Sequence, residues 1–318
     1  MSNRTVIDDQ DLIQSAFPEW NAVHLAMTAP NVFRVIADIM FDWLSIVAAM
    51  LVLHRFGWWS GPVAIAWIGN RQRALANLLH DAGHRNFAGP HQLNDVLAWL
   101  FIAPPLFNSL MVYREFHARH HAWLGDPRGD PDYITARIEP DHGWWRPYLA
   151  VLLRPSVWTG SILGHIHLRQ TRLSQKSCIV GWWTITLGAM TYCVGFHTAA
   201  VFIGVWMLAR ATVFHAITTF REFCDHFGRR PSGIFNYTRD VSSHSIWRWI
   251  IHPRNNGYHL THHLIPSVPY HRLAQAQRRL LELPAFASTA RVCYSYFFGP
   301  DAVVREWEVH SGGDRGTA

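Results

Sequence analysis

The chain has 318 residues, of which 49% are hydrophobic, 14% aromatic and only 16% charged. An average globular protein carries about 25% charged residues, so this composition excludes a disordered chain, and four cysteines are too few for a disulfide scaffold. The net charge of +6 comes mostly from arginines scattered between apolar segments. That scatter is typical of the flanks of membrane helices and argues against nucleic acid as a partner.

The chain begins with a polar segment, residues 1–31, which lacks a basic region followed by an apolar run and so does not resemble a cleaved signal peptide. Apolar residues then dominate 32–53 and 57–79, which we predict to be two membrane-spanning helices. The first of them contains three charged residues, Arg34, Asp38 and Asp42.

Residues 93–112 are also apolar, but Pro104 and Pro105 lie at their middle and should break a helix there. Histidine clusters flank this segment on both sides. If both clusters face the same side of the membrane, the segment cannot cross it once, so we predict a re-entrant or interfacial hairpin. A simple span, which would place the clusters on opposite sides, is the alternative.

The longest stretch without Asp, Glu, Lys or Arg runs from Ser177 to Ala209. Extended to Phe220 it would measure roughly 65 Å as a helix, about twice the thickness of a bilayer core, so we predict two spans at 178–196 and 198–219. The two expected outer turns hold a single basic residue, Arg55, whereas the other loops hold many. This asymmetry predicts cytoplasmic termini and cytoplasmic large loops.

These elements predict an all-α integral membrane protein with four transmembrane helices and a cytoplasmic helical cap. We expect a cytoplasmic N-terminal segment at residues 1–31, a membrane domain at 32–310 and a flexible tail at 311–318. The predicted location is a bacterial inner membrane, which the chain would cross several times.

Histidine is unusually frequent, with 21 residues, and eight of these fall in three clusters. The clusters are His80-Asp-Ala-Gly-His84, His117-Ala-Arg-His120-His121 and His259-Leu-Thr-His262-His263. At this histidine content an HxxxH pair is expected about once by chance, but two copies of HxxHH are not. On a helix, residues i, i+3 and i+4 share one face, so each cluster can direct its imidazoles toward common metal ions.

Eight imidazoles exceed the four ligands of a tetrahedral zinc ion, and the sequence contains no HExxH motif. They suit two metal ions with open positions, and imidazole binds iron well. We expect twelve of the other histidines to be core or interfacial residues that are satisfied by their neighbours, namely His24, His54, His91, His142, His165, His167, His197, His215, His244, His252, His271 and His310.

The segments HDAGH, EFHARHH and NNGYHLTHHLIPSVPYHRL resemble the three histidine boxes of the membrane fatty acid desaturase and hydroxylase superfamily, in order and in separation. The resemblance covers roughly residues 58–273. It implies two iron ions at the cytoplasmic ends of four transmembrane helices, O₂ as co-substrate, and a lipid-like or small amphiphilic substrate in an internal tunnel.

The resemblance adds a ninth histidine, because the Asp225-His226 pair stands where many members of the superfamily have an acidic residue followed by a ligand. The implied iron ligands are His80, His84, His117, His120, His121, His226, His259, His262 and His263. Asn255 matches a common polar position near the irons. Asp81 and Asp225 can orient ligand rings through their second ring nitrogens.

The predicted function is therefore that of an O₂-dependent di-iron oxidoreductase (EC 1.14 type) that introduces a double bond into an acyl chain or similar amphiphile. A hydroxylase or oxygenase acting on a hydrocarbon, carotenoid or small metabolite would use the same boxes and is the alternative. The resemblance implies an external ferredoxin-like or cytochrome-like electron donor, and it assigns no acid–base residues beyond the metal centre. A metal transporter or a scaffolding membrane protein is a competing class. Transport sites usually lie near the bilayer midplane, whereas these histidine clusters are expected at the cytoplasmic ends of helices.

Overall fold

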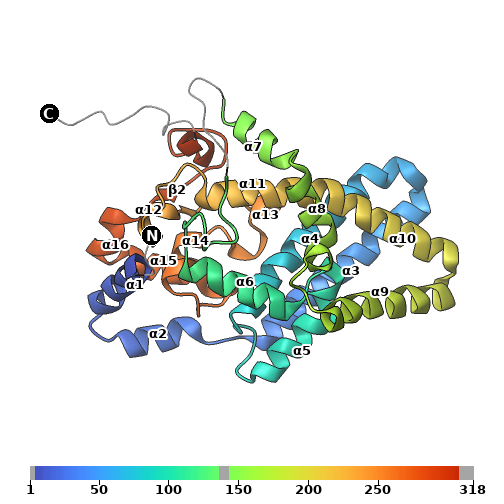
Figure 1. The fold of residues 1–318 in the computed structure, drawn as a ribbon, viewed down its shortest axis with the longest axis horizontal. Coiled ribbons are helices and arrows are strands. Elements are labelled where there is room, and N and C mark those ends of the chain that lie inside the picture. Colours follow the sequence, from blue (N-terminus) through green and yellow to red (C-terminus); the bar gives the residue numbers. More distant parts are fainter. Residues whose placement is uncertain (1–3, 136–142, 308–318) are drawn as a thin grey trace. The chain divides into compact units, whose positions relative to one another are not determined.

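The computed structural model describes residues 4–135 and 143–307, which are mostly helical (Figure 1). They form two compact units, each assembled from segments that are distant in sequence. The histidine unit takes its described residues from the ranges 1–29, 115–151 and 219–318, and the hairpin unit comprises 30–114 and 152–218. The tail predicted at 311–318, together with His142 and His310, lies outside the described residues.

The hairpin unit is built around two pairs of long helices that pack against each other. Its elements are α3 (Val32–Phe56), η1 (Gly57–Ser60), α4 (Gly61–Gly83), α5 (His91–Phe101), η2 (Pro104–Leu106), the start of α6 (Leu110–Ala122), α8 (Pro155–Leu163), η3 (Gly164–His167), α9 (Leu173–Val194), α10 (Phe196–Ala209), the π-helical turn η4 (Arg210–Phe214) and the start of α11 (His215–His226).

The three charged residues in the first half of α3 are paired, which explains how this part of the helix tolerates them. Arg34 donates to the Asp38 carboxylate one turn later, at 2.9 Å. Asp42 is fully buried and accepts a hydrogen bond from Arg71 of α4, at 3.1 Å. A buried carboxylate without such a partner would be costly. The pair therefore joins α3 to α4 inside an otherwise apolar contact.

The helical structure of residues 93–112 is interrupted at the two prolines. Helix α5 ends at Phe101, and the short turn η2 contains both prolines. The freed carbonyl groups at this break accept hydrogen bonds from indoles of α9: Trp182 donates to Leu100 O at 2.8 Å, and Trp183 donates to Pro104 O at 3.1 Å. The break is thus stabilised by side chains from a distant part of the sequence.

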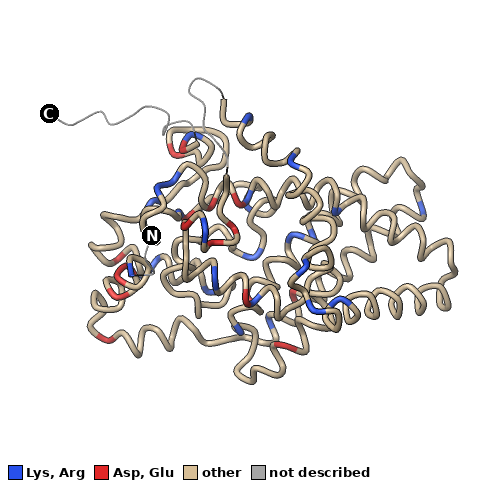
Figure 2. The backbone as a smooth tube through the Cα atoms, in the orientation of Figure 1, with Lys and Arg blue, Asp and Glu red and all other residues tan. Residues whose placement is uncertain are grey.

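Within residues 4–135 and 143–307, three helical stretches are long and apolar enough to cross a bilayer: Trp20–Gly83, Leu173–Val194 and Phe196–His226. Figure 2 shows the near absence of charge on α9 and α10, where Lys176 is the only charged residue. The stretch Trp20–Gly83 has 64 residues and contains both α3 and α4. The number of crossings and the position of the cap stay predictions.

The histidine unit consists of short helices and one small sheet. Its elements are α1 (Arg4–Ala16), α2 (Trp20–Thr28), the end of α6, α7 (Trp145–Leu152, of which Leu152 belongs to the hairpin unit), most of α11, α12 (Ile234–Tyr237), β1 (Asp240–Val241), α13 (Trp247–Ile251), η5 (Pro253–Asn255), α14 (His259–Leu264), η6 (Tyr270–Arg272), α15 (Leu273–Leu281), α16 (Pro284–Thr289), β2 (Val292–Cys293) and η7 (Val303–Trp307).

The core of the histidine unit surrounds α14, whose six residues are all buried. Helix α1 contributes Gln10, which donates to the backbone carbonyl of His263 at 3.0 Å. Strands β1 and β2 pair in parallel, with Asp240 opposite Val292 and Val241 opposite Cys293. This sheet brings the C-terminal segment beside the residues that hold α14.

Candidate metal centre

Four buried histidines of the histidine unit converge on one point. They are His120 from α6, His226 from the last turn of α11, and His259 and His263 from α14. Each offers a ring nitrogen, and these four atoms lie within 4.8 Å of one another. The Nε2 atom of His259 lies 2.9 Å from Nε2 of His226 and 3.0 Å from Nε2 of His263. We call these residues the four-histidine group.

A second set, the three-histidine group, consists of His117, His121 and His262 in the same unit. The Nε2 atom of His121 lies 3.0 Å from that of His117 and 3.1 Å from that of His262. The ring of His121 also stacks on that of His263, with centroids 4.1 Å apart. Seven of the nine predicted ligands therefore gather in this unit, in two adjacent groups.

The two remaining predicted ligands belong to the hairpin unit. His80 lies in the last turn of α4, and His84 is the residue that follows this helix. Their ring centroids are 5.3 Å apart, and their candidate ligand nitrogens lie within 4.8 Å of each other. The HxxxH spacing thus brings both rings to one side of the helix end, as expected for helical residues four apart.

Hydrogen bonds at Nδ1 fix the orientation of two rings in the four-histidine group. His120 donates from Nδ1 to Asp130 Oδ1 at 2.8 Å, and His226 donates from Nδ1 to the backbone carbonyl of Tyr237 at 3.3 Å. Because a carbonyl can only accept, the proton of a neutral His226 ring must be on Nδ1. Its Nε2 atom then carries a lone pair directed at the Nε2 atom of His259.

This arrangement fits a metal ion. Two unprotonated nitrogens at 2.9–3.1 Å repel each other unless a proton or a cation lies between them. Neutral imidazole nitrogens are metal ligands, and such ligands usually donate their other N–H to a carboxylate or a carbonyl. Asp130 and the Tyr237 carbonyl provide both kinds of acceptor. The residues therefore match a nitrogen-rich metal site.

Burial controls which of these rings carry charge. It lowers the pKa of His259 and His263 far below the ordinary value, with further lowering by neighbouring histidines, so both rings are neutral and able to bind a cation. Burial also lowers the pKa of His120, but the hydrogen bond and charge of Asp130 outweigh it and raise the net value. His120 is consequently the ring of this group most strongly coupled to a carboxylate.

Asp225, a predicted orienting residue, lies next to His259 of the four-histidine group, on the Nδ1 side of its ring. Its Oδ2 atom is 3.6 Å from Nδ1 of His259 and 2.8 Å from the guanidinium of Arg221. Its Oδ1 atom accepts a hydrogen bond from His252 at 3.1 Å. The structure therefore places Asp225 beside one of the four rings.

Asp81, the other predicted orienting residue, and Asn255, the predicted polar residue near the irons, both have hydrogen-bond partners outside the histidine clusters. Asp81 is buried and accepts a hydrogen bond from Asn86, at 3.5 Å. Asn255 accepts from Arg248 at 2.9 Å and donates to the carbonyl of Tyr270 at 3.1 Å. The bonds of Asn255 join segments around the third cluster, whereas that of Asp81 lies beside the first. A role for either residue at the metal stays a prediction.

Three contributors emerge only from the structure: Asp130, His252 and Asp240. Asp130 follows the second cluster in an acid-rich loop, DPRGDPD, which is the one sequence signal that could have drawn attention to it. Asp240 is buried and accepts hydrogen bonds from the backbone and hydroxyl of Thr261, at 3.0 and 2.7 Å, which holds α14 between its histidines. Burial raises its pKa to about 6 despite these bonds.

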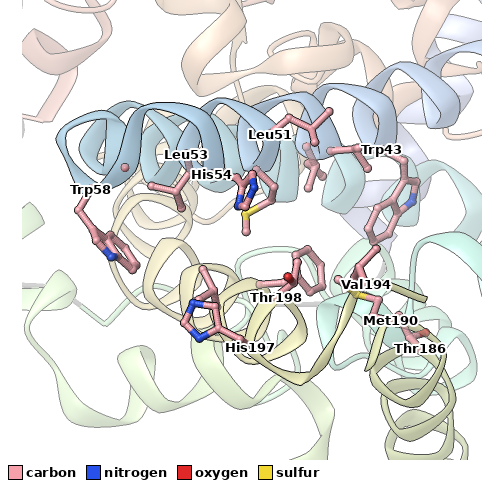
Figure 3. A pocket seen from close by; sticks show the side chains of 16 residues that line it. Trp43, Leu51, Leu53, His54, Trp58, Thr186, Met190, Val194, His197 and Thr198 are labelled. Atoms are coloured by element: carbon pink, nitrogen blue, oxygen red, sulfur yellow. The ribbon is translucent and has the colours of Figure 1, made fainter. Parts of the chain in front are cut away.

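The hairpin unit also contains a cavity of about 740 Å³ between α3, α9 and α10 (Figure 3). Its lining is largely apolar, with Trp43 at one end and Trp58 at the other, and His54 and His197 face it from opposite helices. The cavity adjoins the turn between α3 and α4. His80 occupies the opposite end of α4, roughly 29 Å away at the helical rise per residue.

Comparison with known proteins shows which sequences this chain resembles. The sequence model described as fatty acid desaturase matches residues 56–295, more than half of the chain. A dihydrorhizobitoxine desaturase from Bradyrhizobium elkanii is 29% identical over 266 residues, covering 78% of this chain and 76% of that protein. A sphingolipid delta(4)-desaturase from Drosophila melanogaster is 25% identical, covering 85% of this chain and 82% of that protein.

A third relative, an sn-1 oleoyl-lipid 12-desaturase from a Synechocystis strain, is 21% identical and covers 77% of this chain and 75% of its own length. The match spans all three histidine clusters, and the relatives are desaturases. The protein is therefore an oxidoreductase with the long apolar helices of a membrane protein and histidine groups suited to metal binding. The chain belongs to the fatty acid desaturase family.

Proposed function

We propose that the protein is an O₂-dependent di-iron oxidoreductase that introduces a double bond into an acyl chain or a similar amphiphilic substrate. The observation that supports this most is the convergence of four buried imidazole nitrogens from three separate helices. The relatives named above act, by their names, on an oleoyl lipid, a sphingolipid and dihydrorhizobitoxine. A substrate with a long or flexible apolar portion is the class common to the two lipid-named relatives.

We assign one iron ion to the four-histidine group and a second to the three-histidine group together with His80 and His84. The assignment of His80 and His84 is supported by the order of the three boxes and by their pairing at the end of α4. When bound, the irons would supply the O₂-dependent abstraction of hydrogen from an unactivated C–H bond. Forming one alkene and two molecules of water from O₂ also takes two electrons and two protons, which we assign to an external ferredoxin-like or cytochrome-like donor.

The chain's own contribution is to orient the ligands and exclude water. Asp130 and the carbonyl of Tyr237 hold the rings of His120 and His226 by Nδ1, so that Nε2 faces the centre. Asp240 fixes α14 by bonding Thr261 between the histidines. Such partners, which bond ligands rather than metal, tune affinity and position in metalloproteins.

For the membrane, we propose four crossings at 32–53, 57–79, 178–196 and 198–219, a re-entrant or interfacial segment at 93–112, and a domain at 32–310 that follows the segment 1–31. The positive-inside pattern supports cytoplasmic termini and a cytoplasmic metal centre in a bacterial inner membrane. Helices α9 and α10, whose single charged residue is Lys176 near the start of α9, are compatible with a lipid environment.

The test combines metal analysis with product analysis. The purified protein should contain two irons per chain, and expression in a host that lacks the activity should yield a product lighter by two hydrogens. His263→Ala should abolish the product, whereas His244→Ala, which alters an exposed histidine, should not. The double variant of His80→Ala and His84→Ala should retain a single iron. Iron-free active protein would refute the proposal, and a product that gains oxygen would assign a hydroxylase instead.

A further inference from the structure

A buried series of polar side chains runs from the C-terminal segment to the four-histidine group. Tyr296, which follows β2, is 1% exposed, and its hydroxyl lies 2.7 Å from Nδ1 of His252. Nε2 of His252 lies 3.1 Å from Oδ1 of Asp225. Oδ2 of Asp225 lies 3.6 Å from Nδ1 of His259. The description of the metal centre includes Asp225 and its bond to His252, but it gives no role to Tyr296 or to the second ring nitrogen of His252.

The chemistry of the groups determines which one donates and which one accepts each hydrogen bond in this series. A neutral tyrosine hydroxyl can donate to an imidazole nitrogen, and a carboxylate can only accept. His252 therefore accepts at Nδ1 from Tyr296 and donates from Nε2 to Asp225. Burial raises the pKa of Tyr296 well above its usual value, with a smaller effect from neighbouring thiol and carboxylate groups, so its hydroxyl keeps its proton.

Asp225 in turn influences which ring nitrogen of His259 carries the proton. Asp225, held through Oδ1 by His252, presents Oδ2 to Nδ1 of His259, and this favours the proton of the His259 ring at Nδ1. The lone pair of that ring is then on Nε2, which faces His226 and His263 at 2.9 and 3.0 Å. Arg221 contacts Oδ2 at 2.8 Å, so His252 is the partner of the other carboxylate oxygen.

We propose that Tyr296 and His252 are positioning residues, which hold Asp225 so that the Nε2 lone pair of His259 is available to a metal ion. The proposal rests on the proposed function in that it requires a metal in the four-histidine group. It makes the C-terminal segment part of the metal site, although this segment carries none of the nine predicted ligands.

The test measures metal binding directly. Full-length protein, freed of metal, is titrated with Co²⁺ and, without oxygen, with Fe²⁺, and the release of each metal to a chelator is timed. Tyr296→Phe removes only the hydroxyl and should weaken affinity roughly tenfold, and His252→Phe should weaken it by about the same or more. The matched controls are Tyr294→Phe and His244→Phe, which alter exposed residues and should bind like the wild type.

A double-mutant cycle separates positioning from a general loss of packing. If Tyr296 acts through His252, adding Tyr296→Phe to His252→Phe should change metal affinity no further, because coupled residues are not additive. Full additivity, or wild-type affinity in both single variants, would overturn the proposal. Absence of metal binding by the wild type would instead overturn the proposed function.

Discussion

At the scale of single residues, the metal centre depends on which ring nitrogen of each histidine is occupied by a protein partner. His120 and His226 use Nδ1 for Asp130 and for the carbonyl of Tyr237, which leaves Nε2 for the centre. The same nitrogen of His121 approaches those of His117 and His262. The consistent use of Nε2 means that loss of a partner at Nδ1 should disturb the centre without removing a ligand.

Asp130 provides a direct test at this scale. Asp130→Asn should lower the affinity for iron or cobalt about 10- to 100-fold, because the neutral amide is a weaker acceptor for the Nδ1 proton of His120. Asp126→Asn is the control on the same loop. Its side chain accepts hydrogen bonds from the backbone N–H groups of Arg128 and Gly129, which an amide oxygen can also do. Equal affinities for the two variants and the wild type would contradict the role of Asp130.

The sequence predicts the ligands better than the residues that orient them. Histidines three and four apart on a helix must share a face, so spacing alone predicts His259, His262 and His263 as candidate ligands. Asp130 reaches His120 through a loop whose path no periodicity specifies. His252 looks like an ordinary buried histidine until the fold places it between Asp225 and Tyr296.

At the scale of elements, a close backbone contact fixes the C-terminal segment beside α11. Gly228, just after this helix, has a φ of +76°, and a Cβ atom there would lie 2.6 Å from the carbonyl oxygen of Glu306. Both the left-handed backbone and the lack of space require glycine at this position. The contact belongs to the same C-terminal segment that supplies Tyr296.

Gly228→Ala should therefore lower the thermal midpoint and speed the loss of metal to a chelator. Gly299→Ala separates the two causes, because Gly299 has a φ of +92° but open space around its Cβ position. Its substitution should add backbone strain of about 1 kcal/mol only. Similar midpoints for both alanine variants would show that the approach of Glu306 to Gly228 contributes nothing to stability.

The elements themselves could be read from the sequence where local rules decide. The break at Pro104 and Pro105 follows from proline chemistry, and the end of α5 at Phe101 agrees with it. The pairing of Asp42 with Arg71 could not be read, since the two residues are 29 positions apart and meet only when α3 packs on α4. From hydropathy alone, Asp42 is only a charged residue that interrupts an apolar stretch.

At the scale of the molecule, the four-histidine group joins parts of the chain that are remote in sequence. A metal ion held by His120, His226 and His259 would connect α6, α11 and α14. Ligands that bind only the folded state stabilise it, by about 2.7 kcal/mol at a concentration 100 times the dissociation constant. Removal of metal should therefore lower the free energy of unfolding of the whole histidine unit.

This predicts a higher thermal midpoint for protein loaded with Fe²⁺ or Co²⁺ than for protein treated with a chelator. His263→Ala should reduce the increase because it removes one donor from the four-histidine group. His244→Ala, at an exposed position, should leave the increase intact. Identical midpoints with and without metal in the wild type would argue against a metal site in this unit.

The discontinuous make-up of the histidine unit has a consequence for how the protein is made. All three apolar helical stretches end at or before His226, whereas α14 and Tyr296 lie beyond them. A ribosome delivers the chain from its N-terminus, so every hydrophobic helix leaves the exit tunnel before the last ligands do. We therefore expect a chain that stops before α14 to carry the apolar helices and six of the nine proposed ligands, but to lack the three histidines that complete both groups.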